Sequence, residues 1–325
     1  SATYGQTLSL TTSGGSGSGS VSWSVVSGTC TVSGSTLTPG DAGSSCVVRA
    51  TKAQDTNYLV ESSADTAVVI ARASQSSLVV SSTSATYGQT LSLITSGGNG
   101  TGAVTWQIML GTCTVSGSTL TPGDAGSTCT VKASKAQDTN YLVENSSTTT
   151  VTINRASQAS LTVTSTSATY GQNYTLTTSG GSGAGAVTWT VVSGTCTVSG
   201  STLTPGNAAS SCVVRATKAL DTNYNAVNSA DTAITINRAS QAALSVSSTS
   251  ATYGQTLSMT STGGSGTGSV SWTVVSGTCS VTGSTLTPGD AGSLCVVRAS
   301  KAQDTNYLVE SSADTAVVIA RASQS

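Results

Sequence analysis

The chain has 325 residues, a net charge of −1 at pH 7, only 8% charged residues, and neither His nor Phe. Its 12 Lys and Arg residues are too few to form the positive surface that binds nucleic acid or an anionic membrane. No apolar run reaches the ~20 residues of a membrane-spanning helix, so we expect no membrane insertion.

A hexapeptide, SATYGQ, divides the sequence into repeats. Its copies begin at Ser1, Ser84, Ser167 and Ser250, which gives a period of 83 residues. A fixed period of this length indicates that each copy is one structural unit. The sequence therefore predicts a tandem array rather than one large domain.

In chain order, the first repeat begins with segments in which apolar and polar residues alternate, as in strands with one buried face. Leu8 and Leu10 share one face of the first such segment, and a loop rich in Gly and Ser follows. The next segment carries Val21, Trp23 and Val25 on one face. We expect Trp23 to point into the core.

The middle of the repeat contains two turn signals and a third strand. The sequence SG at 33–34 predicts the turn of a short hairpin, and PGDAG at 39–43 predicts a tight turn. The strand that follows places Cys46, Val48 and Ala50 on its inner face.

The repeat ends with a loop that begins at Lys52, a strand at 67–71 and a polar linker, ASQSS, at 73–77. Leu78–Val80 then precedes the next SATYGQ and has the pattern of another strand, so each domain is expected to begin before the hexapeptide. With the first lacking its opening strand, the expected domains are residues 1–75, 76–158, 159–241 and 242–325.

About seven short strands per repeat, frequent turns and no helical pattern predict an all-β fold. The arrangement favours tandem immunoglobulin-like Greek-key β-sandwiches with one disulfide per domain.

Cysteine spacing supports this domain model. Each repeat has two Cys at the same spacing, which favours one bridge inside each repeat. There is no C-x-x-C pair and no His, so a zinc site is not predicted. Structural disulfides imply an oxidising, extracellular location. The expected bridges are Cys30 with Cys46, Cys113 with Cys129, Cys196 with Cys212, and Cys279 with Cys295.

Catalysis is not predicted, because His is absent, the Cys are expected to be paired, and no Ser has a base nearby in sequence. The carboxylates of Glu61 and Asp65 do not recur in all copies, since Val227 and Thr148 stand at equivalent positions. We therefore expect no enzymatic activity, no cofactor and no bound metal.

The loop DTNY, present in all four copies, has two main interpretations. In the first, Asp55 and Asn57, with Asp65 as a further ligand, offer oxygens to Ca²⁺ at a junction between domains. Alternatively, Asp55 closes a turn through backbone N–H groups while Tyr58 packs on the sandwich edge. No D-x-D-x-D-G ligand pattern is present, so the structural interpretation is favoured. An isopeptide bond from Lys52 is disfavoured by its position in a loop.

Three motifs carry a resemblance to a known group: TYGQ at Thr3–Gln6, SGTCTVSG at Ser27–Gly34 and KAQDTNY at Lys52–Tyr58. The chain resembles the bacterial immunoglobulin-like tandem repeats of very long surface proteins. The resemblance covers every copy and implies secreted adhesin or stalk modules.

Two features differ from antibody-type domains. The Trp precedes both Cys, and the Cys are 16 residues apart instead of joining distant strands across the sandwich. We therefore expect the bridge to hold a local hairpin region.

The predicted function is a non-enzymatic stalk or fibre region of an extracellular bacterial surface protein or adhesin. One alternative is a filament that assembles by strand donation, and another is a multivalent module that binds glycan or protein. The expected partners are neighbouring repeats in cis or copies of the chain itself. Any cell-surface glycan or protein ligand would bind through regions outside these 325 residues.

The start of the first domain carries one further expectation. An edge without its opening strand exposes backbone donors and acceptors, which invites a strand from elsewhere. We expect that strand to come in cis from an upstream continuation, and donation by another molecule is the alternative.

Overall fold

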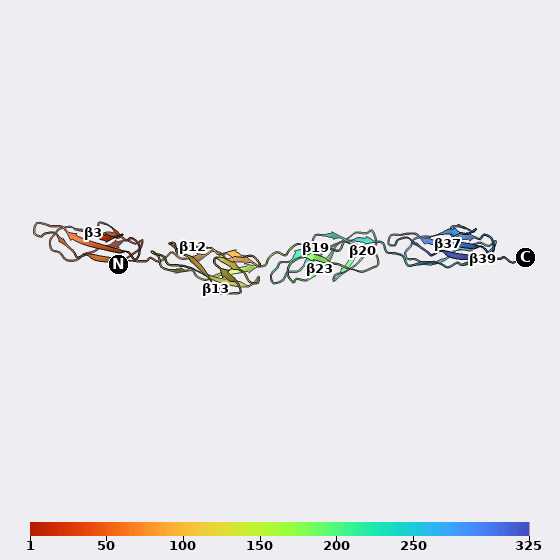
Figure 1. The fold of residues 1–325 in the computed structure, drawn as a ribbon, viewed down its shortest axis with the longest axis horizontal. Helices are drawn as coiled ribbons and strands as arrows, with labels where there is room; N and C mark the ends of the chain where they lie inside the picture. Colours follow the sequence, from red (N-terminus) through yellow and green to blue (C-terminus); the bar gives the residue numbers. More distant parts are fainter. Residues whose placement is uncertain (325) are drawn as a thin grey trace. The chain divides into compact units, whose positions relative to one another are not determined.

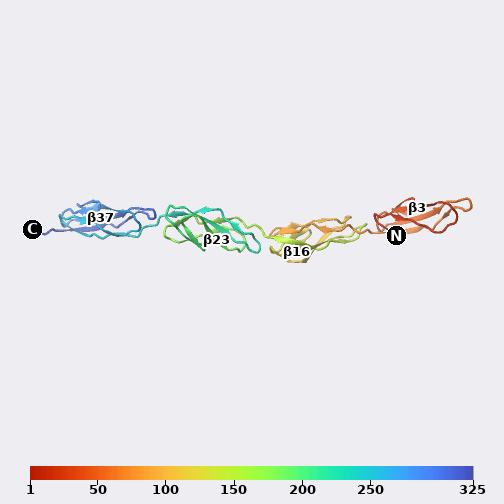
Figure 2. The same cartoon turned by 180° about the vertical axis from the view of Figure 1, so that it is seen from behind.

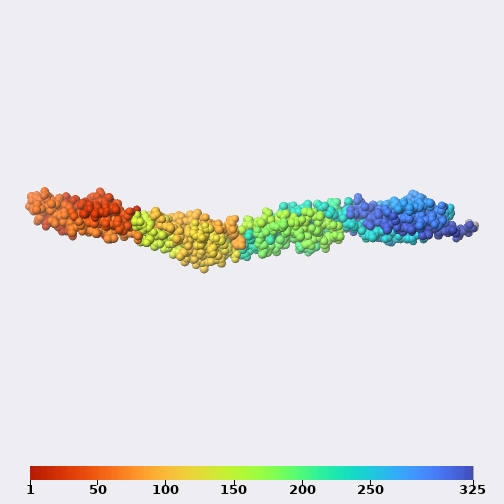
Figure 3. Space-filling model, in the orientation of Figure 1, coloured from red at the N-terminus to blue at the C-terminus, as the bar shows by residue number. Residues whose placement is uncertain are grey.

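The computed structural model describes residues 1–324 and consists of strands, turns and loops (Figure 1). This described range contains no helix, and so none that could cross a membrane. Contacts group the chain into two compact units, Ser1–Ala156 with Thr222–Tyr224, and Ser157–Asp221 with Asn225–Ser325. Within each unit, the residues of one repeat form a body of their own in the space-filling view (Figure 3).

The second repeat shows the complete sandwich. One sheet has the order β10-β18-β16-β13 with β17 beside β16, and β11-β15-β14 forms the opposite sheet. The opening segment contributes two strands, of which β9 pairs with β12 in a sheet of two strands and β10 pairs in parallel with β18. This is the immunoglobulin-like Greek-key arrangement, so the predicted fold class is confirmed. The strands are β9 (Val79–Val80), β10 (Ser84–Thr86), β11 (Leu91–Ser92), β12 (Thr95–Ser96), β13 (Val104–Leu110), β14 (Thr114–Ser116), β15 (Thr119–Thr121), β16 (Thr128–Lys135), β17 (Glu144–Asn145) and β18 (Thr149–Asn154).

Alternation along β16 builds the core between the two sheets. Cys129, Val131 and Ala133 are fully buried, while the intervening residues are less so. Trp106 on β13 packs against the same cluster, as predicted for the equivalent Trp23 in its own repeat. The half-buried Trp side chains thus pack against the core.

The first repeat has the same two sheets, β1-β8-β6-β3 with β7 beside β6, and β2-β5-β4, but no counterpart of β9 or β12. The chain begins at the end of this repeat that meets the second repeat, as both ribbon views show (Figures 1 and 2). Its strands are β1 (Ala2–Thr3), β2 (Leu8–Ser9), β3 (Val21–Gly28), β4 (Thr31–Ser33), β5 (Thr36–Thr38), β6 (Ser45–Lys52), β7 (Glu61–Ser62) and β8 (Thr66–Ala71).

The third repeat follows the same plan, with the last strand divided into β28 and β29. Its strands are β19 (Leu161–Val163), β20 (Ser167–Thr169), β21 (Tyr174–Thr175), β22 (Thr178–Gly180), β23 (Val187–Gly194), β24 (Thr197–Ser199), β25 (Thr202–Thr204), β26 (Cys212–Lys218), β27 (Val227–Asn228), β28 (Thr232–Ala233) and β29 (Thr235–Asn237).

The fourth repeat again has the complete pattern of sheets. Its strands are β30 (Leu244–Val246), β31 (Ser250–Thr252), β32 (Leu257–Ser258), β33 (Ser261–Gly263), β34 (Val270–Ser276), β35 (Ser280–Thr282), β36 (Thr285–Thr287), β37 (Leu294–Lys301), β38 (Glu310–Ser311) and β39 (Thr315–Ala320).

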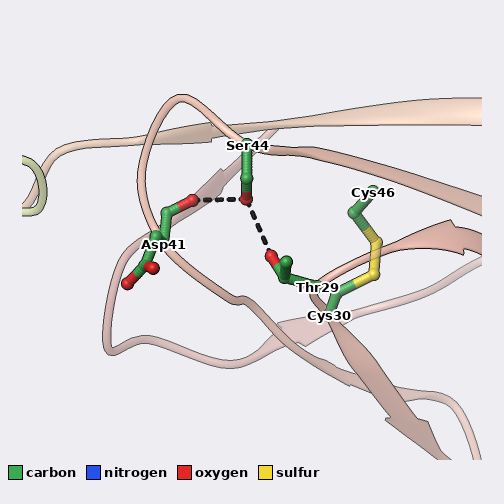
Figure 4. Close-up of a disulfide and its surroundings, with 5 residues drawn as sticks. All are labelled: Thr29, Cys30, Asp41, Ser44 and Cys46. Atoms are coloured by element: carbon green, nitrogen blue, oxygen red, sulfur yellow. Dashed lines mark hydrogen bonds between the residues drawn. A yellow bond between two sulfur atoms is a disulfide. The ribbon is translucent and has the colours of Figure 1, made fainter.

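Each repeat contains one disulfide, and in the first it joins Cys30 to Cys46 (Figure 4). Cys46 lies in β6, whereas Cys30 directly precedes β4 in the opposite sheet. The bridge therefore joins β6 to the segment that leads from β3 into β4, close to Gly28, the residue that pairs with Cys46. Between the two Cys, the chain passes through β4 and β5 of the opposite sheet. The other bridges are Cys113–Cys129, Cys196–Cys212 and Cys279–Cys295.

The residues beside this disulfide close the PGDAG turn. The Thr29 and Ser44 hydroxyls lie 2.9 Å apart, and the Ser44 hydroxyl also donates to the Asp41 carbonyl (Figure 4). The turn is thus held beside the bridge, at the end of the sandwich from which Asp41 projects.

Candidate functional site: the contact between consecutive repeats

The DTNY loop of the second repeat forms an Asx turn around Asp138. One carboxylate oxygen accepts from the backbone N–H groups of Asn140 and Tyr141, each at 2.9 Å. The other accepts from the Thr101 N–H at 2.6 Å. The hydrogen bond from Thr101, followed by that from Asn140, holds the pKa of Asp138 below its ordinary value. The Asx turn predicted for this loop is therefore present.

The Gly-rich loop is shaped to close on this carboxylate. Gly100 has a φ of 75°, and a Cβ at this position would collide with Asp138. The Gly residues therefore let the backbone approach the Asx turn closely, a role that sequence composition alone did not reveal.

The turn holds Asn140 and Tyr141 toward the first repeat. The Asn140 side-chain oxygen accepts from the Ala42 N–H at 2.8 Å, and its NH₂ group donates to Asp41 at 2.9 Å. The Tyr141 ring meets Tyr4 edge to face, with centroids 5.5 Å apart. The PGDAG turn and the YGQ turn of one repeat thus contact the DTNY loop of the next.

The segment that connects the two repeats is also held in place by hydrogen bonds. Ala73 forms a parallel bridge with Tyr141, in which the Ala73 N–H donates to the Asn140 carbonyl at 2.9 Å. The Gln75 amide donates to the Leu142 carbonyl at 2.7 Å, and the Gln75 side chain is buried. The ASQSS segment therefore connects the repeats by specific hydrogen bonds as well as by the covalent chain.

The second unit contains the same contact between the third and fourth repeats. The Asn306 side chain accepts from the Ala208 N–H at 2.9 Å and donates to Asn207 at 3.1 Å. Tyr307 meets Tyr170 with centroids 5.5 Å apart. In the first unit, Asn223 also accepts from the Ala125 N–H at 2.8 Å. The contact tolerates Asn in place of Asp at the PGDAG turn.

The first-repeat residues considered for calcium are not arranged around a common point. Asp55 accepts from the backbone N–H groups of Asn57 and Tyr58 at 2.8 and 3.0 Å. Asp65 instead pairs with Arg49 at 2.7 Å, and this hydrogen bond lowers the pKa of Asp65 and raises that of Arg49. N–H donors occupy the oxygens that a cation would need.

The remaining chemistry is limited. Residues 1–324 contain no group of three or more His, Cys, Asp or Glu side chains that could hold a metal ion. Glu61 lies opposite Lys52 in the β7–β6 register, while Asp65 pairs with Arg49, so the two carboxylates have different partners. The contact between repeats is the feature that recurs with a defined geometry.

Comparisons with known proteins give no family for this chain. No family model matches, and no curated protein matches. Among solved structures, the chain is similar to Drosophila N-cadherin EC1-4, with 11% identity, a TM-score of 0.28, and coverage of 97% of this chain and 94% of that one.

Two further structures are similar at the same level. Sidekick-1 immunoglobulin domains 1–4 match with 12% identity, a TM-score of 0.27, and coverage of 99% and 96%. The S-layer protein rSbsC matches with 14% identity, a TM-score of 0.26, and coverage of 89% of this chain and 45% of that one. The fold assignment rests on the strand pairing itself.

Proposed function

We propose that this chain is a structural repeat region of an extracellular protein, in which immunoglobulin-like domains are held together by specific contacts. The observation that carries the proposal is the joint between the first and second repeats, where Asn140, Tyr141 and Gln75 each bond or pack across the boundary. A flexible tether needs no such contacts. The proposed domains are residues 1–75, 76–158, 159–241 and 242–325.

The proposed location is extracellular, and the proposed setting is a bacterial surface protein or adhesin. The disulfide in each repeat supports an oxidising compartment. The bacterial setting is supported by the sequence resemblance alone. A secretion signal and a wall-anchoring or adhesive segment in the same reading frame would support it, and an intracellular location of the gene product would contradict it.

The double substitution Asn140→Ala with Tyr141→Ala tests the structural role. In small-angle X-ray scattering, the variant should give a broader distribution of end-to-end distances than the parent chain, because one joint has lost its contacts. The matched control is Asn57→Ala with Tyr58→Ala, which changes the same loop in the first repeat. Equal distributions for the parent and both variants would overturn the proposal.

A binding role through aromatic side chains has less support. The four Trp residues are half-buried and pack against the cores of their own repeats. Recognition of glycans or proteins by a stack of exposed aromatics would need these rings at the surface.

A further inference from the structure

The turn that carries one half of each joint lies against the disulfide of its own repeat. In the third repeat, the turn equivalent to PGDAG covers residues 205–209 and leads into β26, which begins at Cys212. Ala208 of this turn belongs to the same buried cluster as Cys196 and Cys212. Its N–H group donates to the Asn306 side chain of the fourth repeat at 2.9 Å. One residue therefore links the cluster around the disulfide to the next repeat.

Two hydroxyl groups connect this turn to the segment that enters the disulfide. The Thr195 and Ser210 hydroxyls lie 3.0 Å apart, and the Ser210 hydroxyl also donates to the Asn207 carbonyl. Thr195 directly precedes Cys196, and a Cβ at Gly206 would collide with the Thr195 hydroxyl. The first repeat has the same arrangement beside its own bridge (Figure 4). The turn and the disulfide are therefore in direct contact.

The turn of the third repeat is held in a conformation that its sequence disfavours. Ala209 stands where the other repeats have Gly, and those Gly residues all have positive φ. The φ of Ala209 is 59°, and no other residue with a side chain has a positive φ in the described part of the chain. A residue with a Cβ adopts this left-handed conformation only at an energetic cost, so the surrounding structure imposes it. The equivalent Gly residues are Gly43, Gly126 and Gly292.

We propose that the disulfide of each repeat positions the joint with the following repeat. The bridge holds the turn in the conformation in which its backbone and side-chain groups reach the Asn of the next DTNY loop. Its influence has one direction, because the turn and the DTNY loop of one repeat contact different neighbours. The proposal rests on the structural role proposed above. It adds that this role depends on the oxidising setting that maintains the bridges.

Hydrogen exchange across the joint between the third and fourth repeats tests the proposal. The Leu308 N–H donates to the Ala239 carbonyl at 2.9 Å, so its exchange reports on the joint rather than on the turn itself. Cys196→Ala with Cys212→Ala should accelerate this exchange by about tenfold, because the turn loses the support that holds it toward the fourth repeat. Strand amides of the third repeat show in the same experiment whether the repeat remains folded.

Two controls separate positioning of the joint from a general loss of stability. Cys279→Ala with Cys295→Ala removes the bridge of the fourth repeat, whose DTNY loop contacts the third repeat, and should leave the exchange of Leu308 unchanged. Leu161→Ala truncates a buried side chain beside the last residue of β26, at the opposite end of this strand from Cys212. It should destabilise the third repeat without accelerating exchange at the joint.

The Ala residue with positive φ gives the sharpest test. Without the bridge, Ala209 can leave its left-handed conformation, whereas Gly adopts that conformation at little cost. Ala209→Gly added to Cys196→Ala with Cys212→Ala should therefore restore part of the protection of the Leu308 N–H. In the parent chain, where the bridge is intact, Ala209→Gly alone should change this exchange little.

Ser210→Ala keeps the proposal falsifiable if the third repeat fails to fold without its bridge. This substitution keeps the disulfide, removes the hydroxyl contact with Thr195, and should accelerate the exchange of the Leu308 N–H. Exchange at the parent rate in Ser210→Ala, or in a folded disulfide variant, would overturn the proposal. Equal acceleration on loss of the fourth repeat's bridge would also overturn it, because the effect would then have no direction.

Asn306→Ala distinguishes failure of this proposal from failure of the structural role. It removes the hydrogen bonds of the joint itself, so it should accelerate the exchange of the Leu308 N–H even with every bridge intact. Acceleration by Asn306→Ala but not by the disulfide variant would overturn only the dependence on the bridge. Exchange at the parent rate in Asn306→Ala would count against the joint as a structural contact.

Discussion

The first and second repeats have nearly the same sequence but differ in how completely their sandwiches are closed. Leu93 of the second repeat is buried, while the equivalent Leu10 is only half-buried. Ser146 is buried, and its equivalent Ser63 is exposed. In the second repeat, Leu78 and its neighbours cover this edge. The segment before SATYGQ is therefore part of the fold of that repeat.

The largest expected effect comes from Leu78→Ala, which removes the side chain that closes the second repeat. Leu78 is 3% exposed, so the substitution should lower the free energy of unfolding of this repeat by about 2–5 kcal/mol. Hydrogen exchange of peptides from the second repeat measures the change. Val79→Ala is the control, because the neighbouring Val79 is 53% exposed and its substitution should have little effect. Equal effects of the two substitutions would contradict the role given to Leu78.

Removal of a disulfide should have the next largest effect on the free energy of unfolding of the repeat that contains it. A bridge over 16 residues contributes about 3 kcal/mol in the chain-entropy model. Cys30→Ala with Cys46→Ala should therefore lower the urea concentration at which the first repeat unfolds, and Cys113→Ala with Cys129→Ala should do the same for the second repeat. Hydrogen exchange in urea follows each repeat separately, and an unchanged urea midpoint in the substituted repeat would argue against a stabilising role of its bridge.

Local patterns predicted the strands well because each strand carries its own evidence. The alternation of Cys46, Val48 and Ala50 reports which face of β6 is buried, and the structure has all three inside. The strand character of Leu78–Val80 was equally readable, since Leu78 and Val80 are buried and Val79 is exposed. The burial pattern of each strand can therefore be predicted from residues that are close together in the sequence.

The joint between repeats was not predictable in this way. An Asx turn accounts for Asp138 but gives no reason for Asn140 or Tyr141, whose partners Ala42 and Tyr4 belong to the preceding repeat. The course of the chain between the two Cys was not predictable for a related reason. Sequence separation does not tell whether the chain between two Cys remains in one sheet or crosses to the other.

Acidification should lower the free energy of unfolding by less than these substitutions do. It should destabilise the first repeat more than the second. Asp55 and Asp138 both have pKa values below the ordinary 3.8, chiefly because backbone N–H groups donate to them. A depressed folded-state pKa stabilises the fold above the unfolded value, and this contribution is lost as pH falls below about 3.8 toward the folded value.

The first repeat has an additional acid-sensitive pair. Asp65 also has a lowered pKa, because Arg49 donates to it, whereas the second repeat has Thr148 at this position. Urea unfolding between pH 5 and pH 2, followed by hydrogen exchange in each repeat, should show a larger loss in the first. Asp65→Thr should make the two repeats respond alike. A gain in stability on acidification would contradict the assigned directions.

The smallest expected effect is that of calcium, and the two repeats provide an internal test. If Asp55, Asn57 and Asp65 formed a calcium site, the first repeat would be stabilised by Ca²⁺ while the second, with Thr148, would respond less. The hydrogen bonds argue otherwise, because Asp55 accepts from backbone N–H groups and Asp65 is paired with Arg49. A cation at either carboxylate would have to displace hydrogen-bond donors that already satisfy the carboxylate.

In each repeat, hydrogen exchange in excess EDTA should therefore be the same as hydrogen exchange in millimolar CaCl₂. Protection that rises with Ca²⁺ in the first repeat alone, and that Asp65→Thr abolishes, would show that the calcium interpretation of the DTNY loop is correct.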